Sequence, residues 1–333
     1  MSQIFGPDRL VLETIRGAER ILVMGHENPD GDALGSSVAL VMALERLGRE
    51  ATLGYQGRVA SHLAFLAADL PSFQRVRGER ERLKEFDLMI MVDCLHPNRI
   101  WPGFSDLSLL PPLLIIDHHP GDPRRVGPVA TYHSPLVSST GELMFKLIED
   151  LGISWRRPLA EALLAAIMSD TGFFSQSNAT AECYRQASVL VAAGARSDYL
   201  VSRLRRNRTL AGFKLLMAAL ATLEIDLDGR LGSMLLSQAM LDATGASLDD
   251  AEGFVEYPRS LAGVEVAALF RVDERGQTRV SLRSALSYSV RELAENFGGG
   301  GHQQAAAYTD PATDPAEARA RFLAQAPRFL KPL

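Results

Sequence analysis

Short, largely apolar runs alternate with longer amphipathic stretches in the first half of the chain. The apolar runs lie at 21–24, 87–92 and 113–116, and each predicts a strand. Because none of them alternates with polar residues, both faces of each strand should be covered, as in a parallel sheet. The amphipathic stretches between them have the spacing of helices. This order predicts a doubly wound, mainly parallel α/β domain.

Capping residues mark where these helices should begin and end. The helical stretch at 33–47 is followed by Gly48, which favours the left-handed backbone that closes a helix. Residues 139–142 read Ser-Thr-Gly-Glu, the pattern of a capping box. Pro158 is placed to open the next helix, and Gly194 to close the one after it.

A basic segment separates the two halves of the chain. It spans 196–214 and holds a single acid, Asp198. Such a segment is either a solvated helix face or a face turned toward an anionic substrate. We interpret residues 196–212 as a linker helix, which makes 1–195 the first domain. The basic side chains are Arg196, Arg203, Arg205, Arg206, Arg208 and Lys214.

Beyond the linker the pattern changes to a different order of elements. Runs at 263–272 and 278–284 predict two strands joined by a turn, and a helix follows that runs into four glycines at 298–301. This order is typical of an α+β domain. We expect a second, smaller α+β domain over 213–333, with the active site in the cleft between the two domains.

Composition places the chain among globular proteins. It has 333 residues, the length of about two domains, and 47% of them are hydrophobic, which excludes disorder. The longest apolar stretches, 109–116 and 162–168, are much shorter than the roughly 18 residues of a membrane-spanning helix. The first residues lack the features of a secretory signal. With two cysteines and no metal-binding spacing, we expect a cytoplasmic protein without disulfides.

The net charge argues against one class of partner. The chain carries 35 basic and 40 acidic side chains, a net charge of −5. Proteins that coat long duplex nucleic acid are usually strongly basic, so that class is disfavoured, and we expect no membrane partner. A small anionic substrate is compatible with this charge, because bound metal ions supply positive charge locally.

Acidic and histidine residues follow the predicted strands of the first domain. In open α/β sheets, ligands bind beyond the carboxyl ends of the strands, so these side chains should meet at one edge. A single Asp in such a place is usually a helix N-cap, and a lone pair of histidines usually packs, but four such segments favour a shared site. The residues are His26, Asp30, Asp32, Asp93, Asp117, His118, His119 and Asp170.

These crowded carboxylates need cations, because they repel one another strongly when nothing neutralises them. Two divalent ions would supply +4 against the −4 of Asp30, Asp32, Asp93 and Asp170. Oxygen and imidazole ligands without thiolate suit Mn²⁺ or a similar first-row ion. Asp93, alone at its strand end, is the natural bridging ligand. The residues therefore predict a site for two metal ions, which we expect to be Mn²⁺.

The motifs resemble those of the DHH phosphoesterase superfamily, named for the triplet found here at 117–119. The chain is most similar to its RecJ-like oligoribonucleases, the nano-RNase and 3′-phosphoadenosine-5′-phosphate phosphatase group. The segments HENPDGDALGS, VDC, DHH and SDTGFF match in order, and VSLRS and GGGGH resemble the DHH-associated domain. The resemblance covers nearly the whole chain. It implies a metal-binding catalytic domain followed by a substrate-binding domain.

The resemblance also implies a role for each residue of the metal site. One Mn²⁺ would be held by three residues, His26, Asp30 and Asp93. The other would be held by four residues, Asp32, Asp93, His118 and Asp170. His119 would lie beside the scissile phosphate as a catalytic residue, and Asp117 would orient a ligating histidine.

The expected substrate-binding residues depend on weaker patterns. Four glycines allow converging backbone N–H groups to bind an anion, although a flexible loop has the same composition. Arg283 and Arg99 resemble arginines that hold the substrate phosphate in the family. For these two, the alternatives are a surface ion pair and a loop cation. The expected residues are Arg99, Arg283, Ser284, Gly299, Gly300, Gly301 and His302.

The function implied by the resemblance is hydrolysis of phosphoesters in small nucleic acids. Substrates would be RNA or DNA oligonucleotides of about two to five nucleotides, cut to mononucleotides, and 3′-phosphoadenosine-5′-phosphate, cut to AMP. A linear or cyclic dinucleotide phosphodiesterase is the alternative, and a manganese inorganic pyrophosphatase a more distant one. A nucleotide-sensing module would lack a metal ligand, and a processive exonuclease would carry a further single-strand-binding domain. A homodimer is compatible with these expectations.

Overall fold

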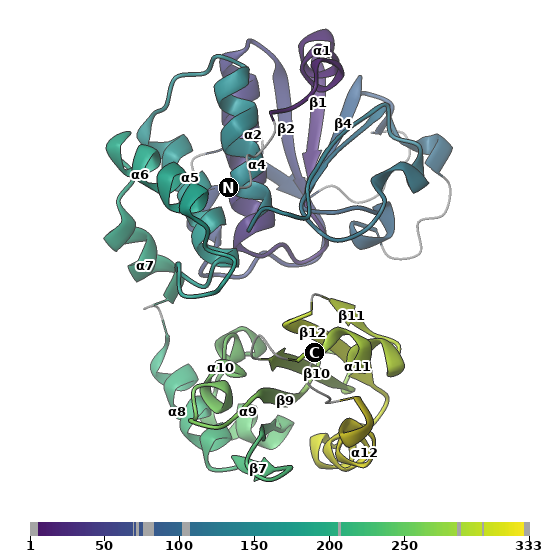
Figure 1. The fold of residues 1–333 in the computed structure, drawn as a ribbon, viewed down its shortest axis with the longest axis vertical. Helices are drawn as coiled ribbons and strands as arrows, with labels where there is room; N and C mark the ends of the chain where they lie inside the picture. Colours follow the sequence, from purple (N-terminus) through teal and green to yellow (C-terminus); the bar gives the residue numbers. More distant parts are fainter. Residues whose placement is uncertain are drawn as a thin grey trace. The chain divides into compact units, whose positions relative to one another are not determined.

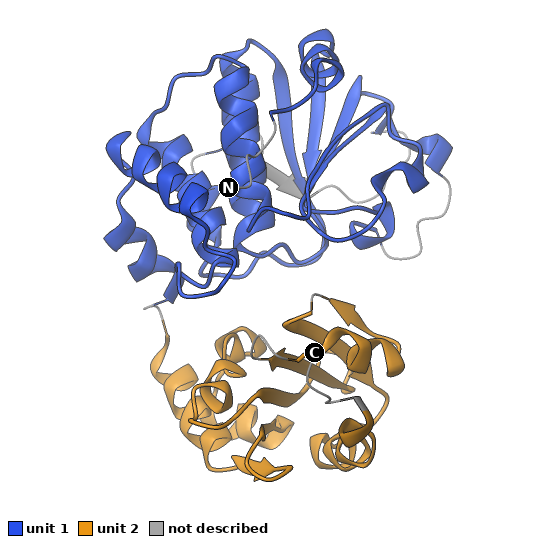
Figure 2. Cartoon of the chain, viewed as in Figure 1, with its two compact units in different colours: residues 1–207 blue, residues 208–333 orange. Residues whose placement is uncertain are grey.

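The computed structural model of the chain describes residues 6–68, 70, 73–75, 83–101, 107–205, 208–284, 288–301 and 303–329. The chain divides into two units, residues 1–207 and 208–333, which we call unit 1 and unit 2 (Figure 2). Each unit has its own sheet and its own hydrophobic core.

Unit 1 is built on a six-stranded sheet in which all paired strands are parallel. The strand order is β3-β2-β1-β4-β5-β6, so the direction of winding reverses between β1 and β4. The carboxyl ends of these two strands therefore flank the place where ligands bind in such sheets. The strands are β1 Arg20–Met24, β2 Glu50–Tyr55, β3 Phe73–Arg75, β4 Leu88–Val92, β5 Leu113–Asp117 and β6 Ala130–His133.

Both faces of the sheet are covered, which is why its strands are apolar throughout. Ile21 and Val23 of β1 belong to the core that the sheet shares with helices, whereas Leu22 and Met24 belong to a second core on the other face. Figure 1 shows the helices α2, α4 and α5 together beside the sheet. The helices of unit 1 are α1 Arg9–Gly17, α2 Gly31–Arg46, α4 Thr140–Asp150, α5 Arg157–Asp170, α6 Ala181–Ala192 and α7 Ser197–Arg205.

The helices α2 and α5 approach each other closely because a glycine lies at their contact. A Cβ added to Gly35 of α2 would lie 2.5 Å from the carbonyl oxygen of Ala162 in α5. The two backbones could not come this near with a larger residue at position 35. The close approach brings the first residues of α2 and the last residues of α5 into one region.

Of the two hydrogen bonds that define a capping box, the one predicted from the Ser139 side chain is present at the start of α4, and the reciprocal one is not. The Ser139 Oγ accepts a hydrogen bond from the Glu142 N–H at 3.3 Å, as in a capping box. The Glu142 carboxylate, however, accepts from the N–H of Ser138 at 2.7 Å and not from that of Ser139. The Glu142 carboxylate thus bonds to the residue before the N-cap, and this bond fixes the backbone at Ser138.

Residues 196–212 do not form one helix, contrary to the sequence-based expectation. Helix α7 ends at Arg205, and α8 begins at Leu210 with Thr209 as its N-cap. The Thr209 Oγ1 accepts a hydrogen bond from the Gly212 N–H at 2.8 Å, which starts a new helix instead of continuing the old one. The division between the units falls between 207 and 208, so α7 belongs to unit 1.

Unit 2 is an α+β structure around a mixed six-stranded sheet of order β11-β12-β10-β9-β8-β7. Only the β8–β9 pair of this sheet is parallel; the other pairs are antiparallel. Its strands are β7 Glu224–Asp226, β8 Leu231–Leu236, β9 Val266–Val272, β10 Thr278–Ser284, β11 Gly300–Gly301 and β12 Ala305–Asp310. Its helices are α8 Leu210–Leu220, α9 Gln238–Thr244, α10 Glu256–Arg259, α11 Arg291–Asn296 and α12 Pro315–Phe329.

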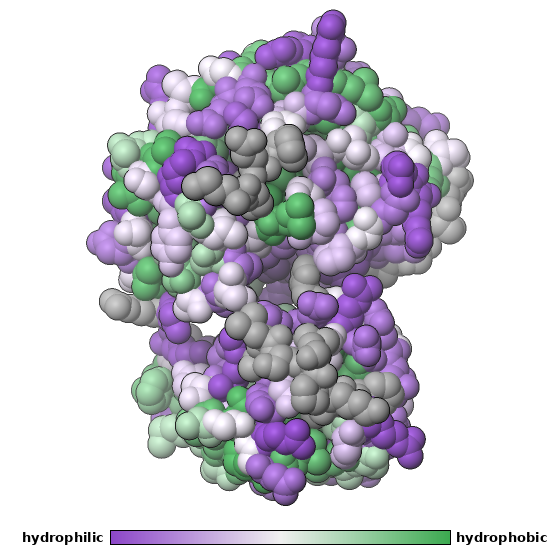
Figure 3. Space-filling view, in the orientation of Figure 1, coloured by the Kyte–Doolittle hydropathy of each residue, from purple (hydrophilic) through white to green (hydrophobic). Residues whose placement is uncertain are grey.

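The structure confirms the predicted fold class, a parallel α/β unit joined to a smaller α+β unit. The surface seen in Figure 3 is largely hydrophilic. An exception is the edge of unit 2 formed by α8, where Leu210, Phe213 and Met217 are exposed. Among the residues that the structure describes, no helix is both long and apolar enough to cross a membrane.

Candidate metal centre and active site

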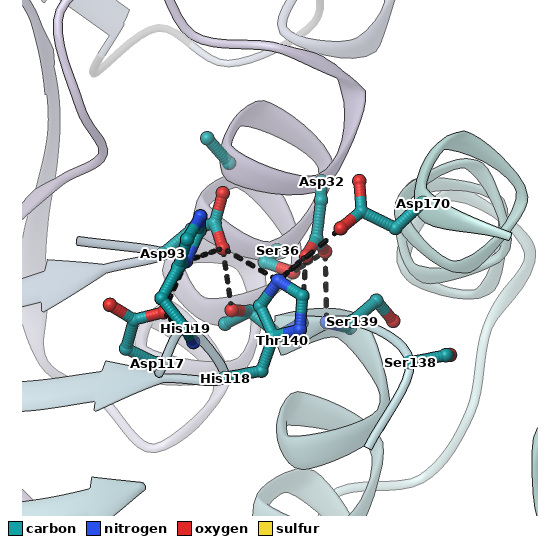
Figure 4. Close-up of polar contacts among 12 residues, drawn as sticks. Asp32, Ser36, Asp93, Asp117, His118, His119, Ser138, Ser139, Thr140 and Asp170 are labelled. Atoms are coloured by element: carbon teal, nitrogen blue, oxygen red, sulfur yellow. Dashed lines mark hydrogen bonds and ion pairs between the residues drawn. The ribbon is translucent and has the colours of Figure 1, made fainter. Parts of the chain in front are cut away.

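The predicted metal ligands lie together at the carboxyl edge of the parallel sheet (Figure 4). His26 follows β1, and Asp30 is the N-cap of α2, with Asp32 inside the first turn of that helix. Asp93 follows β4 and His118 follows β5. Asp170 is the last residue of α5. Four separate segments therefore contribute to one cluster, as the sequence predicted.

The first group of donors surrounds the imidazole of His26. Its Nε2 lies 3.7 Å from Asp30 Oδ2 and 3.7 Å from Asp93 Oδ2. The other ring nitrogen, Nδ1, lies 2.9 Å from the backbone carbonyl of Glu27, which fixes the ring. One donor atom from each of the three residues falls within 4.8 Å of the others, a spacing that suits a single metal ion.

The second group of donors surrounds the imidazole of His118. Its Nε2 lies 3.3 Å from Asp170 Oδ2, 3.6 Å from Asp93 Oδ1 and 3.8 Å from Asp32 Oδ2. Figure 4 shows Asp32 and Asp170 pointing toward one another beside this ring. Asp93 directs one oxygen to each group, the arrangement expected of a ligand that bridges two ions.

The histidine that Asp117 contacts is His119, which was not among the expected metal ligands. Its Nδ1 lies 2.8 Å from Asp117 Oδ1 and 3.5 Å from Asp93 Oδ1. The same Asp117 oxygen accepts the backbone N–H of His119 at 2.9 Å, and the His119 carbonyl lies 2.7 Å from His133 Nε2. Asp117 thus orients His119, whereas we had expected it to orient a histidine of the two ligand sets.

Several residues that position the carboxylates were not predicted as site residues. Thr140, the first residue of α4, donates its hydroxyl to Asp93 Oδ1 at 2.8 Å. The N–H groups of Thr140 and Gly141 donate to the two oxygens of Asp32 at 2.7 and 2.9 Å, and Ser36 donates to Asp32 Oδ1 at 3.0 Å. The only sequence signal for this set was the capping box at 139–142, which places free N–H groups at the start of α4.

The electrostatics of the cluster are those of a cation site. Burial raises the pKa of Asp93 to about 6, and the nearby Asp30 adds to the effect. Burial, together with the carboxylates of Asp93 and Asp170, raises the pKa of Asp32 well above its usual range. For His26, burial opposes the charge, but Asp30 and Asp93 outweigh it and raise the pKa to about 9. The protein alone therefore retains protons here that a bound divalent ion would displace.

The donor set fits divalent metal ions. It is rich in carboxylate oxygens with two imidazoles and contains no thiolate, and its members are buried except for Asp30, which is exposed, and Asp170, which is partly exposed. Neither hard Ca²⁺ cages nor structural zinc sites have this composition, whereas first-row ions such as Mn²⁺ do. A residue set of this kind can neutralise two ions and leave room for a phosphate oxygen.

Arg99 lies near this edge, in the short 3₁₀ helix η2 Pro97–Arg99. Its side chain is exposed, and its carbonyl accepts the Glu27 N–H at 2.6 Å, which ties η2 to the segment that carries His26. His96 caps η2 by accepting the Asn98 N–H at its Nδ1. The structure thus places Arg99 next to the metal ligands in unit 1.

Arg283, on β10 of unit 2, is half-buried and has a carboxylate neighbour. Its Nε lies 3.3 Å from Glu256 Oε1, and its guanidinium donates to the Leu282 carbonyl at 3.0 Å. Burial lowers the pKa of Arg283, and Glu256 partly restores it. The ion pair is the alternative that the sequence left open for this residue, so a substrate phosphate would share Arg283 with Glu256.

Ser284, which we predicted to bind substrate, is a buried residue at the end of β10. Ser284 is 1% exposed, and its hydroxyl donates to the Tyr288 carbonyl at 2.6 Å. Because the hydroxyl proton is used inside the unit, Ser284 ties the end of β10 to Tyr288. His302 lies outside the described residues.

The glycines at 299–301 do not form an open loop of free N–H groups. Gly300 and Gly301 form β11 and pair with Ala307 and Ala306 of β12, and the Gly299 N–H donates to the carbonyl of Ala294 at 2.8 Å. A Cβ at Gly299 would lie 2.2 Å from the Ala307 oxygen. The glycine at 299 is therefore required by close packing on β12. Some of the backbone groups of this segment therefore pair within the unit.

A parallel α/β unit that gathers aspartates and histidines into a candidate site for divalent metal ions is typical of metal-dependent hydrolases of phosphoesters. Two family models match the chain: the N-terminal domain of the DHH family over residues 20–167 and the DHHA1 domain over residues 233–331. The chain belongs to the DHH family. It is an enzyme, a hydrolase acting on phosphoester bonds.

Individual relatives cover nearly the whole chain. It is 32% identical to the bifunctional oligoribonuclease and PAP phosphatase NrnA of Thermus thermophilus, over 95% of this chain and 92% of that protein. It is 27% identical to the cyclic-di-AMP phosphodiesterase PdeA of Listeria monocytogenes, over 89% of this chain but 45% of that one. An exopolyphosphatase-related protein from Bacteroides fragilis has a similar structure, with a TM-score of 0.84, 26% identity, and 95% and 94% of the two chains covered.

Proposed function

We propose that the protein is a manganese-dependent phosphoesterase that cuts short oligonucleotides to mononucleotides and 3′-phosphoadenosine-5′-phosphate to AMP. The observation that carries the proposal is the convergence of His26, Asp30 and Asp93 with Asp32, His118 and Asp170 at one sheet edge. The similarity over almost the full length to the Thermus thermophilus NrnA supports the choice of substrates.

Two groups of residues would hold one Mn²⁺ each. The first group consists of His26, Asp30 and Asp93, and the second of Asp32, Asp93, His118 and Asp170. When bound, the ions supply positive charge and activate water for attack on phosphorus. The chain itself keeps the ligands in place through Thr140, Gly141 and Ser36, which hold Asp32 and Asp93 by hydrogen bonds.

His119 is the proposed catalytic acid. Burial opposes its charge, but Asp117 and Asp93 raise its pKa above the usual value, which favours the protonated ring. Asp117 holds the ring at Nδ1, and Nε2 is the nitrogen that we propose to act on the substrate. From there His119 stabilises the charge on the leaving oxygen or donates a proton to it.

The remaining contacts to substrate would come from both units. In unit 1, Arg99 is proposed to bind a substrate phosphate beside the metal ligands. In unit 2, Arg283 and the segment Gly299–Gly301 are proposed to bind the end of the substrate, with Gly300 and Gly301 at the edge of the sheet. A chain with a net charge of −5 attracts a long polyanion weakly, so we propose substrates of about two to five nucleotides.

The test compares rates on a defined set of substrates in Mn²⁺. The purified chain is given a dinucleotide, a pentanucleotide, an oligonucleotide of about 20 nucleotides, 3′-phosphoadenosine-5′-phosphate, cyclic-di-AMP and pyrophosphate, each at equal concentration. We expect the dinucleotide, the pentanucleotide and 3′-phosphoadenosine-5′-phosphate to have the highest kcat/KM. Arg283→Ala should raise KM by roughly tenfold to a hundredfold, the effect of losing one charge-assisted hydrogen bond, while metal content stays the same.

Two results would contradict the proposal. Equal kcat/KM on the dinucleotide and the longest oligonucleotide, with Arg283→Ala unchanged, would exclude both the length preference and the role of Arg283. Fastest turnover of cyclic-di-AMP or pyrophosphate would replace the proposed substrates with one of the two alternatives.

A further inference from the structure

Two arginines at the end of unit 1 are held by aromatic rings instead of by carboxylates. The guanidinium of Arg203 lies over the ring of Phe65 at 5.0 Å, and that of Arg205 lies over the ring of Phe173 at 5.3 Å. Both arginines are exposed and lie on α7. In the described part of the chain neither has an ion pair with an acidic side chain. An aromatic face orients a guanidinium without neutralising its charge.

A third arginine of the same segment shows the contrast. Arg196 also lies over an aromatic ring, that of Tyr199, at 4.2 Å. Its guanidinium, however, donates to both oxygens of Glu161, at 2.6 and 3.2 Å. The charge of Arg196 is therefore compensated within the fold, whereas Arg203 and Arg205 retain theirs for another anion.

The ring under Arg205 belongs to the segment that carries a metal ligand. Phe173 comes three residues after Asp170, so their Cα atoms are at most about 11 Å apart. The Phe173 N–H donates to the Met168 carbonyl at 2.7 Å, which turns the chain back beside the end of α5. Phe173 and Phe174 both have left-handed backbones, with φ of 60° and 63°. Such conformations are costly for bulky residues and concentrate at functional sites.

The ring under Arg203 is that of Phe65, and it lies near the start of α2, which carries the candidate metal ligand Asp32. Phe65 is in the 3₁₀ helix η1 Ala64–Leu66, and the neighbouring Leu63 Cδ2 is 3.8 Å from where a Cβ of Gly31 would be, at the start of α2. Phe65 also meets Tyr199 of α7 edge-on, with ring centroids 5.8 Å apart. The helix α7 thus makes aromatic contacts with two segments, η1 and the residues that follow α5. Figure 1 shows α7 below α5 in the same unit.

We propose that Arg203 and Arg205 bind non-scissile phosphates of the substrate strand, as a phosphate-binding surface of unit 1 beside the metal ligands. The inference rests on the proposed function, because it assumes a substrate with more than one phosphate. Guanidinium groups pair with phosphate oxygens through two parallel hydrogen bonds, and the aromatic rings reduce the entropy lost when they do so. The basic segment at 196–214 is thereby assigned to substrate binding in part, through Arg203 and Arg205.

The number of phosphates in the substrate should decide the effect of these arginines. A dinucleotide without terminal phosphates has only the scissile phosphate, whereas a pentanucleotide has three further bridging phosphates. Loss of a contact to a non-scissile phosphate should therefore weaken binding of the pentanucleotide more than binding of the dinucleotide. Each lost contact should also reduce the salt dependence of binding, by a slope of about 0.7 per phosphate for a single strand.

The experiment uses the full chain with Arg203→Gln, Arg205→Gln and the double variant, and Arg196→Gln as the matched control. KM is measured for the dinucleotide and the pentanucleotide in Mn²⁺. Binding of a fluorescent pentanucleotide to the metal-free protein is measured in parallel by anisotropy at several salt concentrations. Circular dichroism and melting temperature establish that each variant is folded.

We expect the double variant to raise KM for the pentanucleotide at least fivefold more than KM for the dinucleotide. Its binding of the labelled strand should weaken by tenfold or more with a smaller salt slope, and Arg196→Gln should behave like the parent. Equal values for parent and double variant in the binding assay would overturn the inference, as would an equal loss in Arg196→Gln. If the parent cuts no oligonucleotide, the proposed function fails, and the binding assay still decides the inference.

Discussion

The hydroxyl of Thr140 donates to Asp93 Oδ1 at 2.8 Å, although the two residues are 47 positions apart in the sequence. The backbone N–H of the same threonine donates to Asp32 Oδ2 at 2.7 Å. One residue at the start of α4 thereby orients the carboxylate that follows β4 and another in the first turn of α2. The start of a helix carries free N–H groups and a partial positive charge, which stabilise these carboxylates before any cation binds.

Thr140→Val is expected to weaken metal binding while the fold persists. The valine keeps the shape of the side chain but removes the donor to Asp93, and partners of this kind typically contribute tenfold to a hundredfold in metal affinity. Thr140→Ser, which keeps the hydroxyl, is the control. Calorimetric titration of Mn²⁺ into metal-free protein measures the effect. If valine and serine variants bind Mn²⁺ equally well, the hydroxyl of Thr140 has no part in orienting Asp93.

Asp93→Asn and Asp93→Ala should both abolish turnover, but they should differ in stability. Asp93 has a left-handed backbone, with φ of 58°, which asparagine adopts far more easily than alanine. Without metal, the free energy of unfolding of the alanine variant should therefore be lower than that of the asparagine variant by about 1–2 kcal/mol. Urea unfolding in EDTA measures this difference. Two tightly bound ions and normal turnover in either variant would exclude Asp93 as the bridging ligand.

Removing divalent ions should destabilise the protein. Ions that bind only the folded state contribute about 2.7 kcal/mol when present at a hundredfold excess over Kd. For a unit of this size that corresponds to a fall in Tm of roughly 5–11 °C on adding EDTA, reversed by excess Mn²⁺. The variant Asp32→Asn should show a smaller difference, since it lacks one ligand of the second group. Identical melting curves for the parent with EDTA and with Mn²⁺ would contradict the metal site.

Neighbouring glycines of unit 2 should tolerate alanine very differently. At Gly299 a Cβ would lie 2.2 Å from the Ala307 oxygen and 2.5 Å from the Tyr308 Cβ, whereas at Gly300 no atom lies within 4 Å. Gly299→Ala should therefore lower the free energy of unfolding by about 1–3 kcal/mol, and Gly300→Ala should be near neutral. Denaturant unfolding of both variants tests the difference. Equal stability would show that β12 moves away at little cost.

The sequence predicted that these acidic and histidine side chains cluster, because position in an α/β sheet determines where they meet. Any residue that follows β1, β4 or β5 must lie at the same edge, so the proximity of His26, Asp93 and His118 could be predicted without coordinates. The strands were equally clear, since residues such as Ile21 and Leu22 are buried on opposite faces.

The contacts of single side chains could not be predicted in this way. Asp117 and His119 are two residues apart, and only the conformation after β5 decides that they bond to each other. The glycines near 299 matched an anion-binding pattern, but the structure uses Gly299 to approach β12. A run of glycines does not show which neighbouring residues exclude a Cβ. Here those residues belong to β12, a strand that comes later in the sequence.

The ligands of the metal centre come from segments that begin after β1 and end at the last residue of α5. During synthesis the first ligand, His26, therefore leaves the ribosome well before the last one, Asp170. At about 5–20 residues per second, the delay is roughly seven to thirty seconds. Throughout that interval the nascent chain has an incomplete second group of donors. The complete set of candidate donors is consequently available only after Asp170 has left the ribosome.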